Sequence, residues 1–166
     1  MASGSRGGGV GLLYKKRIRF QKQSCIKAKF SLFEFTNLLL KQGSSSLRVV
    51  VVYRPPSADS LFCEEFPTLL EDLVTATGSL LMVGDFKFHV QDSNDRTALQ
   101  FLQLLETFNL KQHIWEPTHK SGHTLDLLIT RAGENVAGRF CVRDPVLSDH
   151  YAVSCTLTLS KVPFER

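Results

Sequence analysis

Strand-like and helix-like segments alternate along this chain of 166 residues, which predicts an α/β or α+β fold with a layered sheet core. Short apolar runs of strand length recur, and the strongest is LRVVVVY at residues 47–53. Two longer segments, over residues 60–77 and 96–108, repeat apolar residues at helical spacing. The sequence shows no internal repeat and no linker, so a single domain is the simplest organisation.

The first third of the chain is predicted to form strands. A flexible lead over residues 1–9 precedes a strand over 10–20, and residues 25–32 alternate apolar and polar side chains, as a strand with one wet face does. A turn over residues 41–46 leads into the buried strand at 47–53. That strand ends at YRPP, because proline cannot donate a hydrogen bond to the ladder.

The segment over residues 60–77 is predicted to be the first helix. Its apolar side chains fall on one stripe, formed by Phe62, Phe66, Leu69, Leu70, Leu73 and Val74. Pro67 predicts either a kink or a helix start nearer Glu65, and Gly78 ends the helix. Beyond it we expect strands over residues 79–83, 124–130, 139–143 and 151–159, and a second helix over about 96–108, capped from within Asp92–Asp95.

The composition is that of a globular protein, with 43% hydrophobic residues. No apolar run approaches the ~18 residues of a membrane helix. The N-terminus lacks the charged and apolar regions of a signal sequence, so we expect an intracellular protein without a membrane span. The four cysteines form no C-x-x-C pair, which favours buried thiols in a reducing compartment over a zinc site. They are Cys25, Cys63, Cys141 and Cys155.

Basic residues are concentrated toward the N-terminal end. Residues 1–50 contain ten lysines and arginines against one acid, Glu34, whereas the remainder contains ten against fifteen acids. This distribution fits a polyanionic partner such as DNA, or else an ordinary solvated strand face. The run Lys15–Arg19 is also similar to a nuclear-localisation signal, so we expect the protein in the nucleus.

Two polar motifs stand at predicted strand ends. Gly84-Asp85-Phe86 follows an apolar strand, and side chains two apart on a strand share a face, so Asp85 and Lys87 would point into one cleft. A carboxylate there can orient water or hold a metal, although a plain strand-end turn explains the motif equally well. Ser148-Asp149-His150 opens the last strand, where a histidine beside carboxylates can polarise a phosphate oxygen or shuttle a proton, with a structural turn as the alternative.

Asp126 is a lone acid in an apolar strand, and burying an unpaired carboxylate is costly. Either it faces water at a sheet edge, or it pairs with a cation or an imidazole such as His150. Tyr53 and Arg54 end the buried strand and could contact phosphate, with a core tyrosine and a structural turn as the alternative. The remaining histidines show no ligand spacing and are taken as loop or structural residues; they are His89, His113, His119 and His123.

Four segments, taken in order, resemble the endonuclease/exonuclease/phosphatase superfamily: VVVVYRPP, LLMVGDF, EPTHKSGHTLDLLIT and DPVLSDHYAV. More closely, they resemble the apurinic-type endonuclease domain of LINE (non-LTR) retrotransposons, from Gly7 to about Leu159. The resemblance implies an α/β layered sandwich of two packed mixed sheets flanked by helices. It implies a partial domain over residues 10–160 that lacks the family's opening strands, and Mg²⁺-assisted hydrolysis of a DNA phosphodiester.

The resemblance also assigns a role to each matching residue. Tyr53 resembles the tyrosine on the phosphate side, Asp85 the aspartate that orients the attacking water, and Asp126 the acid that supports the histidine. His150 resembles the histidine that stabilises the pentacovalent phosphate, and Asp149 resembles a metal-linked aspartate. The residues expected to contact substrate are Thr118, Arg54 and Lys87.

Two departures from the family pattern bear on activity. The family has Gly-Asp-Phe-Asn where this chain has Lys87, and a lysine pairs with Asp85, repels a cation and lacks the acceptor of the amide. The family's main metal ligand is a glutamate on an earlier strand, and Glu34, the only acid before Asp59, lies beyond the first two predicted strands. We therefore expect a retrotransposon-derived endonuclease-like domain with impaired or lost cleavage. The alternatives are an active Mg²⁺-dependent DNA endonuclease, a non-catalytic remnant that binds nucleic acid or protein, and a phosphoesterase acting on lipid or inositol phosphates.

Overall fold

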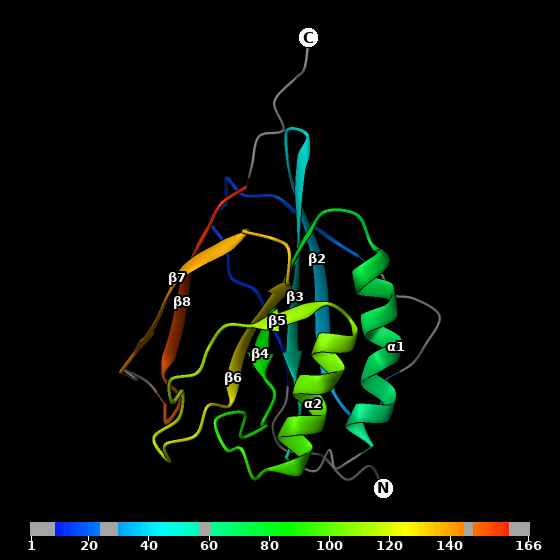
Figure 1. Cartoon of the computed structure of the whole chain (residues 1–166). Coiled ribbons are helices and arrows are strands. Elements are labelled where there is room, and N and C mark those ends of the chain that lie inside the picture. The colour runs from blue at the N-terminus through cyan, green and yellow to red at the C-terminus, as the bar shows by residue number, and fades with distance from the viewer. Residues whose placement is uncertain (1–8, 24–29, 57–60, 145–147, 160–166) are drawn as a thin grey trace, which may run out of the picture.

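The computed structural model describes residues 9–23, 30–56, 61–144 and 148–159 (Figure 1). Among these residues the centre is a mixed sheet of six strands in the order β1-β2-β3-β4-β6-β5. The bounds are β1 Phe20–Lys22, β2 Glu34–Gln42, β3 Ser45–Tyr53, β4 Ser79–Asp85, β5 Leu110–Gln112 and β6 Asp126–Arg131. β3 and β4 are parallel and connect through a helix, whereas the other neighbouring pairs of this sheet are antiparallel.

The six-stranded sheet is the middle of three layers. Helices α1 (Phe62–Thr75) and α2 (Arg96–Thr107) cover one face, and the antiparallel pair β7 (Ala137–Arg143) and β8 (Ala152–Leu157) lies against the other (Figure 1). The predicted α/β class with layered sheets is confirmed in outline. Two details are wrong within the described residues, because the second sheet is antiparallel rather than mixed and the helices flank only the larger sheet.

Side-chain alternation along the strands separates two cores. Val50 and Met82 lie in the core beneath the helices. Val49 and Leu81 lie in the core between the large sheet and the β7–β8 pair. Because neighbours on a strand point to opposite faces, the odd-numbered residues of β3 and β4 face the small sheet. This parity sets the direction of the last side chain on each of these strands.

Phenylalanines dominate the core beneath the helices and anchor the segment that follows β4. Phe62 of α1 meets Phe88 edge to face at 5.6 Å between ring centroids, and Phe101 of α2 stacks on Phe88 at 4.3 Å. Phe86 packs on Phe101 at 5.5 Å, and both Phe86 and Phe88 are almost completely buried. Lys87 stands between these two anchors, so its backbone position is determined by the core.

The predicted N-terminal strands differ from the structure. Residues 10–19 contain no strand, because the chain pairs with β2 only over Phe20–Lys22. The strand predicted over 25–32 is absent at 30–32, and 24–29 lies outside the described residues. The lead over 1–9 also lies outside them except for its last residue. The turn predicted over 41–46 shortens to Gly43-Ser44, because β2 and β3 remain paired up to this point.

The structure contains two strands, β2 and β5, that the sequence did not predict. β2 lies between two other strands, and its apolar run Leu38–Leu40 does not alternate with polar residues. It also carries Asn37, which is buried and accepts a hydrogen bond from Arg48 Nη1 at 3.0 Å. β5 spans only three residues, too few for a periodicity to be visible.

The first helix begins at Phe62, so Pro67 lies inside it and a start nearer Glu65 is wrong. Glu65 instead ties the helix to the segment before β2, since its carboxylate accepts hydrogen bonds from the N–H groups of Ser31 at 2.8 Å and Leu32 at 2.9 Å. This contact positions the helix over the sheet. In the described part of the chain no helix has the length and apolar character needed to cross a membrane.

The cysteines within the described residues are free thiols. Cys63 and Cys155 are half-buried, and Cys141 is exposed. Burial raises the pKa of the Cys63 and Cys155 thiols. The prediction of buried thiols is wrong for Cys141, because the strand that carries it turns this side chain to solvent, and Cys25 lies outside the described residues.

Candidate active site

Three neighbouring strands bring polar side chains to one end of the large sheet. The register pairs Tyr53 of β3 with Asp85 of β4, and Asp85 with Asp126 of β6. Residues in register point to the same face, and strand parity directs this row toward the side of β7 and β8. The motifs YRPP, GDF and LDL are therefore adjacent in space.

Gly84 makes this close approach possible. Its φ is +150°, and a Cβ at this position would lie 1.8 Å from the carbonyl oxygen of Val52. The backbones of β3 and β4 leave no room for a side chain here, so only glycine fits. The glycine lets Asp85 stand directly beside Tyr53.

Lys87 adopts a left-handed backbone conformation with φ of +53°. Asparagine enters this conformation more readily than most residues, which suits the Gly-Asp-Phe-Asn pattern that the chain departs from. Lys87 Nζ lies 2.8 Å from Asp85 Oδ2, so the predicted ion pair is present. Asp85 Oδ1 is buried and has no hydrogen-bond partner among the described residues.

Asp126 and His150 form the pair that the sequence suggested. His150 Nδ1 lies 2.8 Å from Asp126 Oδ2, which fixes the imidazole ring and directs Nε2 away from the carboxylate. Burial raises the pKa of the Asp126 carboxyl above its ordinary value, although the hydrogen bonds from His150 and Thr118 oppose this shift. The carboxylate is therefore not a strand-edge acid facing water, and its natural role is to support the histidine.

Thr118 is fully buried and holds the start of β6. Its Oγ1 accepts hydrogen bonds from the N–H groups of Leu125 and Asp126, each at 2.9 Å. Its carbonyl accepts from the N–H of Tyr151 at 2.7 Å, which joins this strand end to the segment carrying His150. The hydroxyl thus has a structural task, and its contact with substrate stays a prediction.

His119 is a site residue that the sequence did not single out. It forms an isolated antiparallel bridge with His150, and the two rings lie 4.9 Å apart at an angle of 78°. Its Nε2 lies 3.0 Å from Asp149 Oδ2, and this hydrogen bond lowers the pKa of the Asp149 carboxyl. The only sequence signal was its position next to Thr118 in the EPTH segment.

Arg54 braces the segment behind the site. Its Nη1 donates to the carbonyls of Phe86 at 3.2 Å and Lys87 at 3.1 Å. The guanidinium also lies 4.3 Å from the centroid of the Phe88 ring. These contacts help to hold Lys87 against Asp85, while the predicted contact of Arg54 with substrate stays a prediction.

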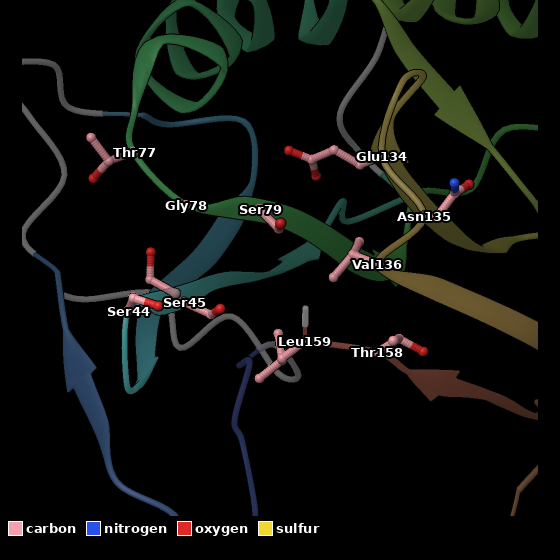
Figure 2. A pocket seen from close by; sticks show the side chains of 11 residues that line it. Ser44, Ser45, Thr77, Gly78, Ser79, Glu134, Asn135, Val136, Thr158 and Leu159 are labelled. Carbon is pink, nitrogen blue, oxygen red and sulfur yellow. The ribbon is translucent and has the colours of Figure 1, made fainter. Parts of the chain in front are cut away.

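A pocket of about 540 Å³ lies at the opposite end of the sheet (Figure 2). The turn at Ser44, the start of β4 at Ser79 and the loop at Glu134 line it. Glu134 is already engaged, because it accepts hydrogen bonds from the N–H of Leu80 at 2.9 Å and from Arg131 Nη1 at 2.7 Å. This carboxylate supports the sheet, so the pocket is distinct from the candidate active site.

Residues 47–154, well over half of the chain, match the sequence family described as endonuclease-reverse transcriptase. The chain belongs to this family. It is a domain of the endonuclease/exonuclease/phosphatase superfamily, so the resemblance carried by the four sequence segments is confirmed. A search of curated proteins gave no significant match.

Solved structures support the same fold. The endonuclease domain of TRAS1, a telomere-specific non-LTR retrotransposon, matches with a TM-score of 0.65 and 16% identity over 76% of this chain and 63% of that one. The human Nocturnin catalytic domain with bound sulfate matches with 0.50 and 18% identity over 77% and 53%. A beta toxin from Staphylococcus aureus matches with 0.50 and 11% identity over 75% and 57%. At these identities the likeness concerns the fold, and this chain spans less than two thirds of each structure.

The endonuclease-reverse transcriptase family generally uses a divalent metal. The carboxylates at the candidate site are Asp85, Asp126 and Asp149. His150 engages Asp126, and the ammonium of Lys87 engages Asp85 at 2.8 Å and repels a cation. Mg²⁺ needs carboxylates that are free to join a near-octahedral shell of oxygen ligands. Asp149 is engaged by His119 at 3.0 Å, and Asp85 Oδ1, which has no partner within the described part of the chain, belongs to the carboxylate that Lys87 pairs with. The described residues therefore do not fit a Mg²⁺ site by themselves.

Proposed function

We propose that this chain is a retrotransposon-derived endonuclease-like domain that binds nucleic acid and has impaired phosphodiester cleavage. The observation that carries the proposal is the 2.8 Å ion pair between Lys87 Nζ and Asp85 Oδ2. By resemblance, Asp85 is the group that orients the attacking water. In this chain the ammonium group of Lys87 holds one of the two carboxylate oxygens of Asp85.

The ion pair impairs cleavage for two physical reasons. Asp85 Oδ2 is held by Lys87 and Oδ1 is buried, so neither oxygen is open to an attacking water, and lysine has no acceptor that could replace the amide. The ammonium also repels any cation that approaches Asp85. Loss of one preorganised polar group in an active site typically lowers the rate by about 10²–10³.

A working Mg²⁺-dependent endonuclease is the second candidate, and it is favoured by the geometry of the other half of the site. His150 is oriented by Asp126 at 2.8 Å, and Tyr53 is in register with Asp85. These residues would bind and stabilise a phosphate, and cleavage would follow if the attacking water were positioned. Lys87 is the difference between the two candidates that a single substitution can test.

Nicking of supercoiled plasmid DNA in Mg²⁺ separates the two candidates. We expect Lys87→Asn to nick at least about tenfold faster than the wild type, because it frees Asp85 and restores the amide. The double variant Lys87→Asn/His150→Ala is the control and should lose this gain.

A wild type that nicks as fast as Lys87→Asn, with activity removed by His150→Ala, would contradict impairment and favour the working enzyme. If neither chain nicks, cleavage is absent and replacing Lys87 is not sufficient to restore it.

Nucleic-acid binding is supported by exposed basic side chains at the N-terminal end of the described chain. Lys15, Lys16, Arg17 and Arg19 are all exposed, and this segment is not a strand, so it is not the solvated strand face considered from the sequence. Arg17 and Arg19 line one cavity with Lys41 near the end of β2. These positive charges suit a polyanion.

The basic cavity and the candidate active site occupy opposite ends of the large sheet. Lys41 pairs with Ser46 at the start of β3, whereas Tyr53 ends the same strand. A nine-residue strand spans roughly 27 Å, so a DNA duplex bound at the basic cavity has to extend over about eight base pairs to reach Asp85.

A further inference from the structure

We propose that His119, Asp149 and His150 form a site for a transition-metal cation such as Zn²⁺. Each of the three offers one ligand atom, and these atoms lie within 4.8 Å of one another. Two imidazoles and one carboxylate differ from the all-oxygen set that Mg²⁺ prefers. The inference rests on this geometry, and a metal on His150 Nε2 would compete with the phosphate contact that the resemblance gives this histidine.

Main-chain pairing holds the three residues together. His119 and His150 face each other across an antiparallel bridge. Next to it, the N–H of Lys120 donates to the carbonyl of Asp149 at 3.0 Å. The spacing of the ligands is therefore determined by the backbone and does not depend on the side chains alone.

The second nitrogen of each imidazole is already engaged. His150 Nδ1 lies 2.8 Å from Asp126 Oδ2, which leaves Nε2 for a metal, and metal-binding histidines are typically supported by such a carboxylate. His119 Nδ1 lies 2.6 Å from Ser121 Oγ. The N–H of Ser121 also donates to His119 Nδ1 at 3.1 Å, so His119 Nε2 carries the proton and donates it to Asp149 Oδ2 at 3.0 Å. A metal at Nε2 therefore needs the other tautomer, in which Nδ1 donates to Ser121 Oγ.

The arrangement suits Zn²⁺ in particular. Bonds of about 2.0–2.1 Å at tetrahedral angles place ligand atoms roughly 3.3 Å apart. The His119–Asp149 distance of 3.0 Å is close to this value. The other ligand atoms lie within 4.8 Å, so metal binding requires them to move closer, and the 65% exposed Asp149 side chain has room to rotate. A cavity of about 350 Å³ adjoins His119 and leaves space for water as a fourth ligand. Three protein ligands and one water are the usual set of an open zinc site.

Calorimetric titration of the full chain with Zn²⁺ tests the site. We expect one Zn²⁺ per chain, and a loss of affinity of at least about tenfold in His119→Gln and in Asp126→Asn, which removes the charge that supports His150. His89→Gln is the matched control, because His89 stacks on His123 at 4.0 Å and takes no part in the site, and its affinity should equal that of the wild type.

Equal affinity in the wild type and His119→Gln, or a loss only in His89→Gln, would overturn the proposal. Imidazole NMR signals of the wild type give a test that needs no variant. The signals of His119 and His150 should shift together and saturate at one equivalent of Zn²⁺, and excess Mg²⁺ should not reverse the shift. Shifts confined to His89 and His123, or reversal by Mg²⁺, would equally exclude the site.

Discussion

At the scale of single residues, Asp126 shows how opposing influences set the state of one carboxyl. Burial raises its pKa, the hydrogen bonds from His150 and Thr118 lower it, and burial prevails. The folded protein therefore holds a proton at Asp126 more readily than the unfolded chain does. Stability linked to this residue must depend on pH.

The Asp126→Asn variant isolates that dependence. A raised folded-state pKa gives a contribution to stability that is fully present below the unfolded pKa and is lost as the pH rises through the folded pKa. Asparagine does not titrate, so the free energy of unfolding of the wild type should fall relative to the variant as the pH rises from about 3 through the pKa of the folded Asp126 carboxyl. Urea denaturation of both chains across this range measures the difference. A difference that stays constant or grows with pH would contradict the assignment.

Site residues differ in how far the sequence reveals them. The Asp126–His150 pair could be predicted, because a lone acid in an apolar strand needs a partner. The Lys87–Asp85 ion pair was also expected, although Lys87 reaches Asp85 from a left-handed conformation beyond the end of β4 and not from an extended strand. His119 could not, since its contacts come from a bridge to a distant segment that no local pattern encodes.

At the scale of elements, strong apolar periodicity made prediction possible. Both helices and the strands β3, β4, β6, β7 and β8 appear within a few residues of their expected bounds. β2 was missed because its inner position and buried Asn37 remove the alternation of an exposed strand. The expected strand over 10–20 failed because pairing with β2 covers only Phe20–Lys22.

The N-cap of α2, which the sequence indicates, makes a measurable contribution to the free energy of unfolding. Asp95 Oδ1 accepts hydrogen bonds from the N–H groups of Thr97 at 3.0 Å and Ala98 at 3.1 Å. Asp95→Ala leaves these groups without their partner and should lower the free energy of unfolding by about 1 kcal/mol. Chemical denaturation measures this loss. Asn94→Ala, one position earlier and exposed, should stay close to the wild type, and an equal loss in both variants would argue against capping.

At the scale of the whole molecule, the basic side chains of the N-terminal segment and the candidate active site lie at opposite ends of the large sheet. The exposed basic side chains of Arg17 and Arg19 meet Lys41 at one end of the large sheet. The row of Tyr53 and Asp85 occupies the other end. The sequence indicated the basic segment and the polar motifs, but it could not show that the sheet holds them apart, because that depends on strand register.

Binding of duplex DNA should therefore depend on the N-terminal charges. We expect Arg17→Ala/Arg19→Ala to weaken binding and to reduce the slope of log K against log salt by roughly 1–2, since each phosphate contact contributes about 0.9. Fluorescence anisotropy at several salt concentrations measures both. The matched control is Arg139→Ala/Arg143→Ala, a pair of exposed arginines on β7. Equal effects of the two pairs of substitutions, or binding that is insensitive to salt, would contradict the proposal that the N-terminal basic side chains bind DNA.

The position of Lys87 between two buried phenylalanines has a genetic consequence. The core anchors the backbone on both sides, and the side chain of residue 87 lies outside that core, so an exchange there leaves the packing of Phe86 and Phe88 in place. Lysine and asparagine codons differ only in their third base. A single nucleotide substitution therefore replaces lysine with asparagine at position 87, or the reverse. Selection can then act on the chemistry of the motif independently of selection on folding.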